Sequence, residues 1–172
     1  MLGHNGTILR HNTKWLDCGP DIMPHLTLRV RMLEGANPPM CVGATVTPVP
    51  GMPDVYDVCT AGGRETDWSE LFYSESYLAE VLSANSTGVT DMHYMFSECY
   101  NLINVYPFDV SSVTNMNGTF GMCTGVISGA LALYERASSK AIPTSHDSTF
   151  YKCGENTVTG AEELAQIPSD WK

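Results

Sequence analysis

Positive charge is scarce in this 172-residue sequence. Nine Lys and Arg stand against 19 Asp and Glu, which gives a net charge of −10. A general nucleic-acid-binding protein would carry a basic patch or stripe, and the sequence has none, so we expect no nucleic-acid partner. The deficit is sharpest over residues 65–126, which hold eight carboxylates and no Lys or Arg. This stretch predicts either a solvated acidic face that keeps the fold soluble or a surface for a cation or a cationic partner.

Long hydrophobic runs are also missing. No stretch approaches the ~18 consecutive apolar residues of a membrane span, so we expect no membrane insertion. The first residues, MLGHNGTILRHNTKWLDCG, contain no continuous apolar core and do not resemble a signal peptide. If Met1 is the native start, we expect a protein that is not exported by the ordinary secretory route.

Motifs for catalysis and metal binding are absent from the sequence. It has no G-x-S-x-G, no G-x-x-x-x-G-K-[ST] and no H-E-x-x-H. The histidines are scattered: His93 is expected to face solvent, and His146 is followed directly by Asp147 and Ser148, the wrong geometry for a triad. The six cysteines form no C-x-x-C and no zinc-finger spacing. The sequence therefore predicts a non-enzymatic protein without catalytic residues, metal ligands or cofactors.

A repeat of 24 residues is the main feature that is present. The pattern V-T-x-M-x-x-x-F-x-x-C occurs twice, as Val89, Thr90, Met92, Phe96 and Cys99, and again as Val113, Thr114, Met116, Phe120 and Cys123. A fixed period in the twenties is typical of stacked strand–helix units of the leucine-rich-repeat type. The i, i+3, i+7 spacing predicts a helix over residues 89–99, and residues 102–106 are expected to form a short strand.

Fainter copies extend the repeat on both sides. Residues 66–72 form a degenerate first copy, in which Glu75 replaces the cysteine, and Phe150 with Cys153 marks a partial last copy. The fold class is therefore predicted as α/β, a short leucine-rich-repeat solenoid of about three turns. Cys99 and Cys123 should stack inside it as small buried hydrophobes, with a disulfide or a metal site as alternatives.

The flanking segments are expected to cap this solenoid. Strand patterns over residues 26–32, 40–49 and 54–59 predict a β-rich N-terminal cap, a three-stranded meander. At the other end, helices are expected over residues 129–139 and 161–166, the second opened by a capping box at Thr159 and Glu162, with Trp171 as a terminal anchor. The predicted domains are an arm at 1–22, a capping unit at 23–64, and the solenoid with its helical cap at 65–172.

The N-terminal arm is predicted to be a hairpin that needs another surface. A two-stranded hairpin is marginally stable alone. We expect the arm to dock on a partner or on the rest of the chain through its apolar side chains, Ile8, Leu9, Trp15 and Leu16.

The repeat V-T-x-M-x-x-M-F-x-x-C resembles the BspA-like class of bacterial leucine-rich repeats. The tail from Gly129 to Trp171 resembles the closing module of such proteins, in a version found in gut bacteria and in their prophages and phages. The resemblance covers roughly residues 25–172. It implies surface display and adhesion rather than catalysis.

Two functions are compatible with this sequence. The first is a structural or accessory protein of a phage virion, of the fibre, spike or decoration type, which binds proteins or glycans on the host surface. Its attachment segment would be residues 1–22, and its binding surface would carry Tyr73, Tyr77, Tyr94 and Tyr100. The second is an adhesion or protein-binding module of a bacterial cell surface. The expected partners are other virion proteins or cell-surface proteins and glycans, and a homo-oligomer is compatible with either location.

Overall fold

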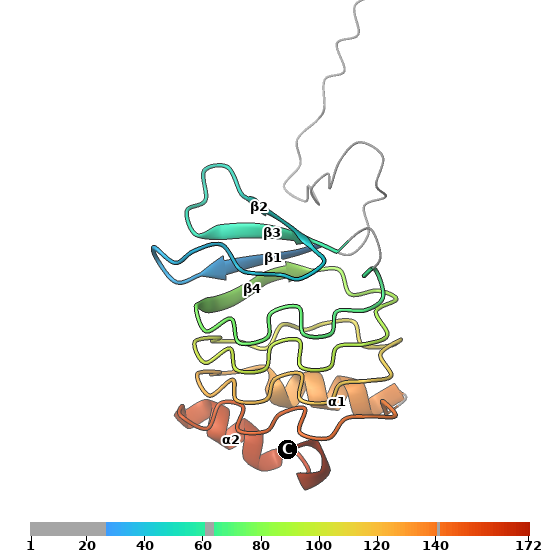
Figure 1. Ribbon diagram of the computed structural model, residues 1–172. Coiled ribbons are helices and arrows are strands. Elements are labelled where there is room, and N and C mark those ends of the chain that lie inside the picture. Colours follow the sequence, from blue (N-terminus) through green and yellow to red (C-terminus); the bar gives the residue numbers. More distant parts are fainter. Residues whose placement is uncertain (1–26, 61–63, 141) are drawn as a thin grey trace, which may run out of the picture.

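The computed structural model describes residues 27–60, 64–140 and 142–172. Its elements in chain order are β1 (Thr27–Met32), β2 (Thr45–Pro48), β3 (Val55–Cys59), β4 (Leu78–Ala84), α1 (Ala130–Lys140), α2 (Val158–Gln166) and the 3-10 helix η1 (Ser169–Trp171). Figure 1 shows the sheet at one end of a stack of chain turns and α2 at the other end. The mixed α/β class that the sequence predicts is confirmed. The predicted arm, with Ile8, Leu9, Trp15 and Leu16, lies outside the described residues.

The four strands form one antiparallel sheet in the order β2-β3-β1-β4. Strands are found within all three predicted segments, but their predicted arrangement as a meander is wrong, because β1 pairs with β3 and β4 rather than with β2. Leu28, Val30 and Met32 of β1 are buried, and Arg29 on the other face pairs with Asp57 of β3 at 2.8 Å. The strict alternation in β1 is therefore the signature of a strand with one buried face.

Four turn segments of the chain, which we call the stacked turns, lie on one another beneath the sheet. They comprise residues 67–75, 91–99, 115–123 and 145–153, and parallel bridges join Asp67 to Asp91, Asp91 to Asn115, and Asn115 to Ser145. The first two steps are offset by 24 residues, as the repeat predicts. The last step is 30 residues because α1 is inserted before it.

The predicted helix over residues 89–99 is wrong, because residues 91–99 form a chain of tight turns. Every second backbone N–H reaches the next stacked turn: Met92 N donates to Asn115 O at 2.9 Å, and Phe96 N to Thr119 O at 2.8 Å. From Met95 onward, the N–H groups between them donate three residues back within the same turn, as Met95 N does to Met92 O. Tyr94 and Glu98 have positive φ angles of 51° and 66°, which an α-helix does not tolerate.

The strand expected over residues 102–106 is also wrong in extent. It reduces to one isolated parallel bridge between Asn104 and Ser128. This side of the stack is nevertheless hydrogen-bonded from layer to layer, since Ile103 N donates to Ala79 O in β4 at 3.0 Å and Ile127 N to Ile103 O at 2.9 Å. Strand β4, which the sequence did not predict, thus joins the sheet to the stacked turns.

A column of phenylalanine rings fills the core of the stack. Phe72, Phe96, Phe120 and Phe150 are each 0–1% exposed, and successive ring centroids lie 5.3, 5.2 and 5.9 Å apart in stacked orientation. The repeat residues that the sequence assigned to the core are therefore buried. Cys99 and Cys123 also stack as expected, and their thiols donate to Phe72 O at 3.1 Å and to Phe96 O at 3.0 Å.

The C-terminal elements close the far end of the stack. Helix α1 begins and ends within one residue of its expected position. The predicted capping box at Thr159 is wrong, because α2 begins earlier and is capped by Thr157, whose side chain accepts a hydrogen bond from Gly160 N. Thr159 instead donates to Ile127 O at 2.8 Å. Trp171 is buried as the expected terminal anchor.

Replacing Gly125, which lies between two layers, should lower the stability of the fold. A Cβ at Gly125 would lie 2.5 Å from the Tyr100 carbonyl oxygen of the preceding layer, so Gly125→Ala forces two backbones apart. We expect this variant to lose about 1–3 kcal/mol of unfolding free energy in chemical denaturation, as overpacked sites do. Gly121→Ala is the matched control, since its Cβ would meet its nearest atom at 3.3 Å, and it should lose less. Equal stability of the two variants would show that the close approach of Gly125 to the Tyr100 carbonyl does not exclude a side chain there.

Candidate functional site

The four tyrosines proposed from the sequence as a binding surface are all exposed. Their exposed fractions are 49% for Tyr73, 60% for Tyr77, 45% for Tyr94 and 41% for Tyr100. The structure brings Tyr73 and Tyr94 together in an edge-to-face contact with ring centroids 6.4 Å apart. Tyr77 instead lines a cleft beside the sheet. Tyr100 follows the buried Cys99 at the next corner of the turn.

Carboxylates surround the Tyr73–Tyr94 pair. Tyr73 Oη donates to Glu98 Oε1 at 3.2 Å, and Ser74 Oγ donates to Glu98 Oε2 at 2.8 Å. The hydrogen bond to Glu98 raises the pKa of Tyr73, because the carboxylate stabilises the neutral phenol. We call Glu70, Tyr73, His93, Tyr94 and Glu98 the tyrosine face. It offers two aromatic rings and two carboxylates across neighbouring stacked turns.

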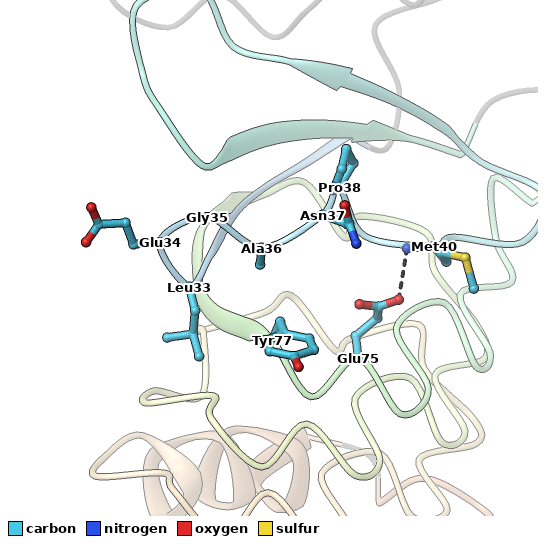
Figure 2. Close-up of a pocket in the computed structure, with 9 residues that line it drawn as sticks. All are labelled: Leu33, Glu34, Gly35, Ala36, Asn37, Pro38, Met40, Glu75 and Tyr77. Carbon is cyan, nitrogen blue, oxygen red and sulfur yellow. Dashed lines mark hydrogen bonds between the residues drawn. The ribbon is translucent and has the colours of Figure 1, made fainter.

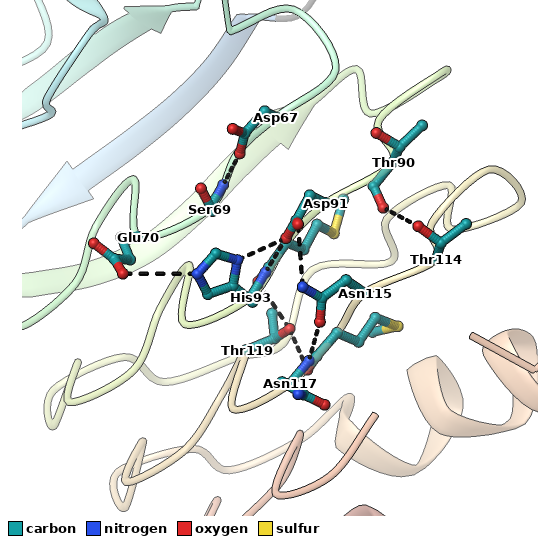
Figure 3. A network of polar contacts seen from close by, with 12 residues as sticks. Asp67, Ser69, Glu70, Thr90, Asp91, His93, Thr114, Asn115, Asn117 and Thr119 are labelled. Carbon is teal, nitrogen blue, oxygen red and sulfur yellow. Dashed lines mark hydrogen bonds and ion pairs between the residues drawn. The ribbon is translucent and has the colours of Figure 1, made fainter. Parts of the chain in front are cut away.

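A polar network supports the tyrosine face (Figure 3). Asp91 Oδ1 accepts from His93 N and contacts His93 Nδ1, both at 2.9 Å, and Asp91 Oδ2 accepts from Asn115 Nδ2 at 3.1 Å. His93 Nε2 lies 3.7 Å from Glu70 Oε1. The prediction that His93 faces solvent is only partly right, since the ring is half-buried between two carboxylates. Its nitrogens orient neighbouring side chains across two turns.

The ring of Tyr94 packs directly on Gly118 of the next layer. A Cβ at Gly118 would lie 2.3 Å from Tyr94 Cε1, so the Tyr94 ring covers this glycine closely. Gly118 also has a φ of +58°, a conformation that L side chains rarely adopt. Gly118 therefore fixes the position of one of the two exposed rings.

The cysteines of the stack are poorly suited to nucleophilic chemistry. Cys99, Cys123 and Cys153 are buried thiols, and burial raises the pKa of each of them. Because the thiolate is the reactive form, these side chains behave as small core residues. Within the described ranges, no group of three or more His, Cys, Asp and Glu could hold a metal ion, and no helix is long and apolar enough to span a membrane.

Residues 65–141 match a family model described as "Mycoplasma protein of unknown function, DUF285". This is a family of leucine-rich-repeat-like surface proteins. The match spans the first three stacked turns, strand β4 and helix α1. No curated protein and no solved structure matches the chain significantly.

Two features of the site were missed at the level of sequence. Asp91 and Asn115 are positioned by their own turns, where each side chain accepts the backbone N–H two residues later. Their 24-residue spacing was the signal, because it places the two side chains at the same position of neighbouring turns. The second feature is the cleft at Tyr77, for which Glu75 at a cysteine position was the only sequence signal.

Proposed function

We propose that this chain is a non-enzymatic binding module built on a short leucine-rich-repeat solenoid with a β-rich cap and a helical cap. The ladder of backbone bonds between residues offset by 24, and the family match over residues 65–141, support the repeat assignment. The sheet and the α2–Trp171 end cover its two ends, as terminal caps of repeat proteins do.

The tyrosine face supports its use in binding. Tyr73 and Tyr94 are about half exposed although their rings touch, so together they offer apolar surface that the fold itself does not cover. Tyrosine is enriched at binding hot spots because it combines a large apolar body with a polar tip. Glu70 and Glu98 beside the rings favour a partner that carries hydrogen-bond donors or positive charge.

We propose display on the surface of a phage particle as the context, with residues 1–22 as the attachment segment and a host-surface protein or glycan as the ligand. The resemblance of the repeats to surface proteins of gut bacteria and their phages supports this context. The alternative is an adhesion module on a bacterial cell, and the match of residues 65–141 to a family of surface proteins supports this alternative. Capsid or tail genes beside the native gene would favour the first location over the second.

Removing the two contacting rings tests the proposed binding surface. The variant Tyr73→Ala/Tyr94→Ala should lose at least about tenfold in apparent affinity on a printed array of bacterial surface glycans and on intact bacterial cells, because aromatic hot spots dominate such interfaces. Tyr151→Ala is the matched control, since Tyr151 is 46% exposed and outside the tyrosine face. Binding that survives the double variant, or an absence of binding by the parent protein to both probes, would refute the proposal.

A further inference from the structure

A cleft of about 500 Å³ lies between the loop after β1 and the first stacked turn (Figure 2). Leu33, Pro38 and Met40 from the loop contribute apolar surface, and Tyr77 and Glu75 lie opposite them. Its nine lining residues, all in the described part of the chain, include two carboxylates and no Lys, Arg or His. Clefts of this volume that combine apolar surface with polar groups are found at ligand sites.

Glu75 occupies the position that cysteine fills in the later turns. Cys99 and Cys123 each use this position to donate a thiol hydrogen bond to the phenylalanine carbonyl of the preceding turn. Among the described residues, no stacked turn precedes residues 67–75, and the Glu75 side chain reaches the loop instead, where Oε1 accepts from Met40 N at 2.9 Å. A carboxylate can accept roughly four hydrogen bonds, so most of its capacity remains for a donor in the cleft.

The surroundings of Glu75 leave its charge available. Arg64, the Lys or Arg nearest to Glu75 in the sequence, directs its guanidinium to Val42 O at 2.7 Å and to the backbone and hydroxyl oxygens of Ser69. Burial raises the pKa of the neighbouring Cys41 to about 12, and the negative charge of Glu75 adds to this effect. The cleft is therefore negative at its base.

The walls of the cleft suit a long side chain with a planar cationic head. Tyr77 is 60% exposed and Met40 82% exposed, so both present surface to a ligand. Arginine packs its aliphatic stem on apolar surface, stacks its guanidinium on aromatic rings and donates in pairs to carboxylates. Lysine could pair with Glu75, but its ammonium cannot stack flat on the Tyr77 ring or donate two parallel hydrogen bonds to one carboxylate.

We propose that this cleft binds an arginine side chain presented by a protein partner, with the guanidinium on Glu75 and against Tyr77. The inference rests on the proposed binding function and names the chemistry of one part of the ligand. The cleft is separate from the tyrosine face, so the two can be tested independently.

Titration of the full chain with N-acetyl-arginine methylamide, followed by amide NMR shifts, tests the proposal. The resonances of Met40, Glu75 and Tyr77 should move with the arginine compound and not with the citrulline analogue, which has the same shape without the charge. Glu75→Gln keeps an acceptor for Met40 N and should weaken binding by about tenfold or more. Glu135→Gln, which removes an exposed carboxylate of helix α1 outside both the cleft and the tyrosine face, should leave the titration unchanged.

Any of these results would overturn the proposal: equal shifts with citrulline, equal affinity in a folded Glu75→Gln variant, or no shift up to about 10 mM compound. Guanidinium chloride binding as tightly as the arginine compound would also overturn it, because the site would then take a small cation rather than a side chain. Loss of array binding in the Tyr73→Ala/Tyr94→Ala variant together with an inert cleft would leave the proposed function standing and remove only this inference.

Discussion

Replacing Phe96 with alanine should lower the free energy of unfolding by about 3–5 kcal/mol, the cost of deleting a fully buried aromatic ring. Phe96 is completely buried and lies at the centre of the ring column, 5.3 Å from Phe72, 5.2 Å from Phe120 and 5.8 Å from Phe108. The cavity would open in the middle of the stack, where backbone bonds hold the layers at fixed spacing and limit collapse. Urea denaturation followed by circular dichroism measures the loss.

Two variants control for this effect. Phe96→Leu keeps much of the apolar volume and should lose clearly less stability than Phe96→Ala. Tyr100→Ala removes an aromatic side chain that is 41% exposed, and it should change the unfolding free energy by about 0.5 kcal/mol or less. A Phe96→Ala protein as stable as the Tyr100→Ala protein would show that the ring column does not carry the stability of the fold.

Replacing Trp171 with alanine should have a comparable effect, about 3–5 kcal/mol, but concentrated at one end of the molecule. The Trp171 ring is 2% exposed; it stacks on His146 at 4.4 Å and meets Tyr134 edge-on at 5.3 Å. It also covers Phe150, the last ring of the column, at 6.3 Å. Without it, the final stacked turn would lose its apolar cover.

Hydrogen exchange can separate this local effect from a global one. In the Trp171→Ala variant, amides of residues 145–153 should exchange much faster, while those of β1 and of residues 67–75 change less, because each layer mainly contacts its neighbours. Trp171→Phe retains an aromatic cover and should restore most of the protection. Uniform acceleration across the whole chain would indicate that the stack unfolds as one unit and that Trp171 is no local cap.

The repeat period and the core were readable from the sequence because the same side chain must fill the same place in each layer. Phe96, Cys99 and their 24-residue partners are buried for this reason. The local backbone was not readable, since an i, i+3, i+7 pattern places side chains on one side in a helix and in a chain of tight turns alike. The positive φ angles at Tyr94 and Glu98 distinguish the two, and neither residue type signals that conformation as glycine does.

The strand order and the candidate sites depend on contacts between distant segments. Strand β4 lacks a clear alternation, and its register with β1 shifts twice, so no simple period marks it. The exposure of Tyr73 and Tyr94 agrees with their selection from the sequence, but their contact depends on the stacking of two turns. One wall of the cleft at Glu75 is a loop that lies more than thirty residues earlier in the chain, so the sequence around Glu75 does not reveal the cleft.

The alternating hydrogen bonds of the stacked turns make this fold extensible. Residues 91–99 donate to residues 115–121, and residues 68–74 donate to residues 91–97 in the same pattern, so a middle layer accepts hydrogen bonds at one edge and donates them from the other. A further 24-residue copy placed between two layers would find the same donors on the layer before it and the same acceptors on the layer after it. The length of the molecule, and with it the number of side chains displayed on its faces, can therefore change by whole layers without redesign of either end.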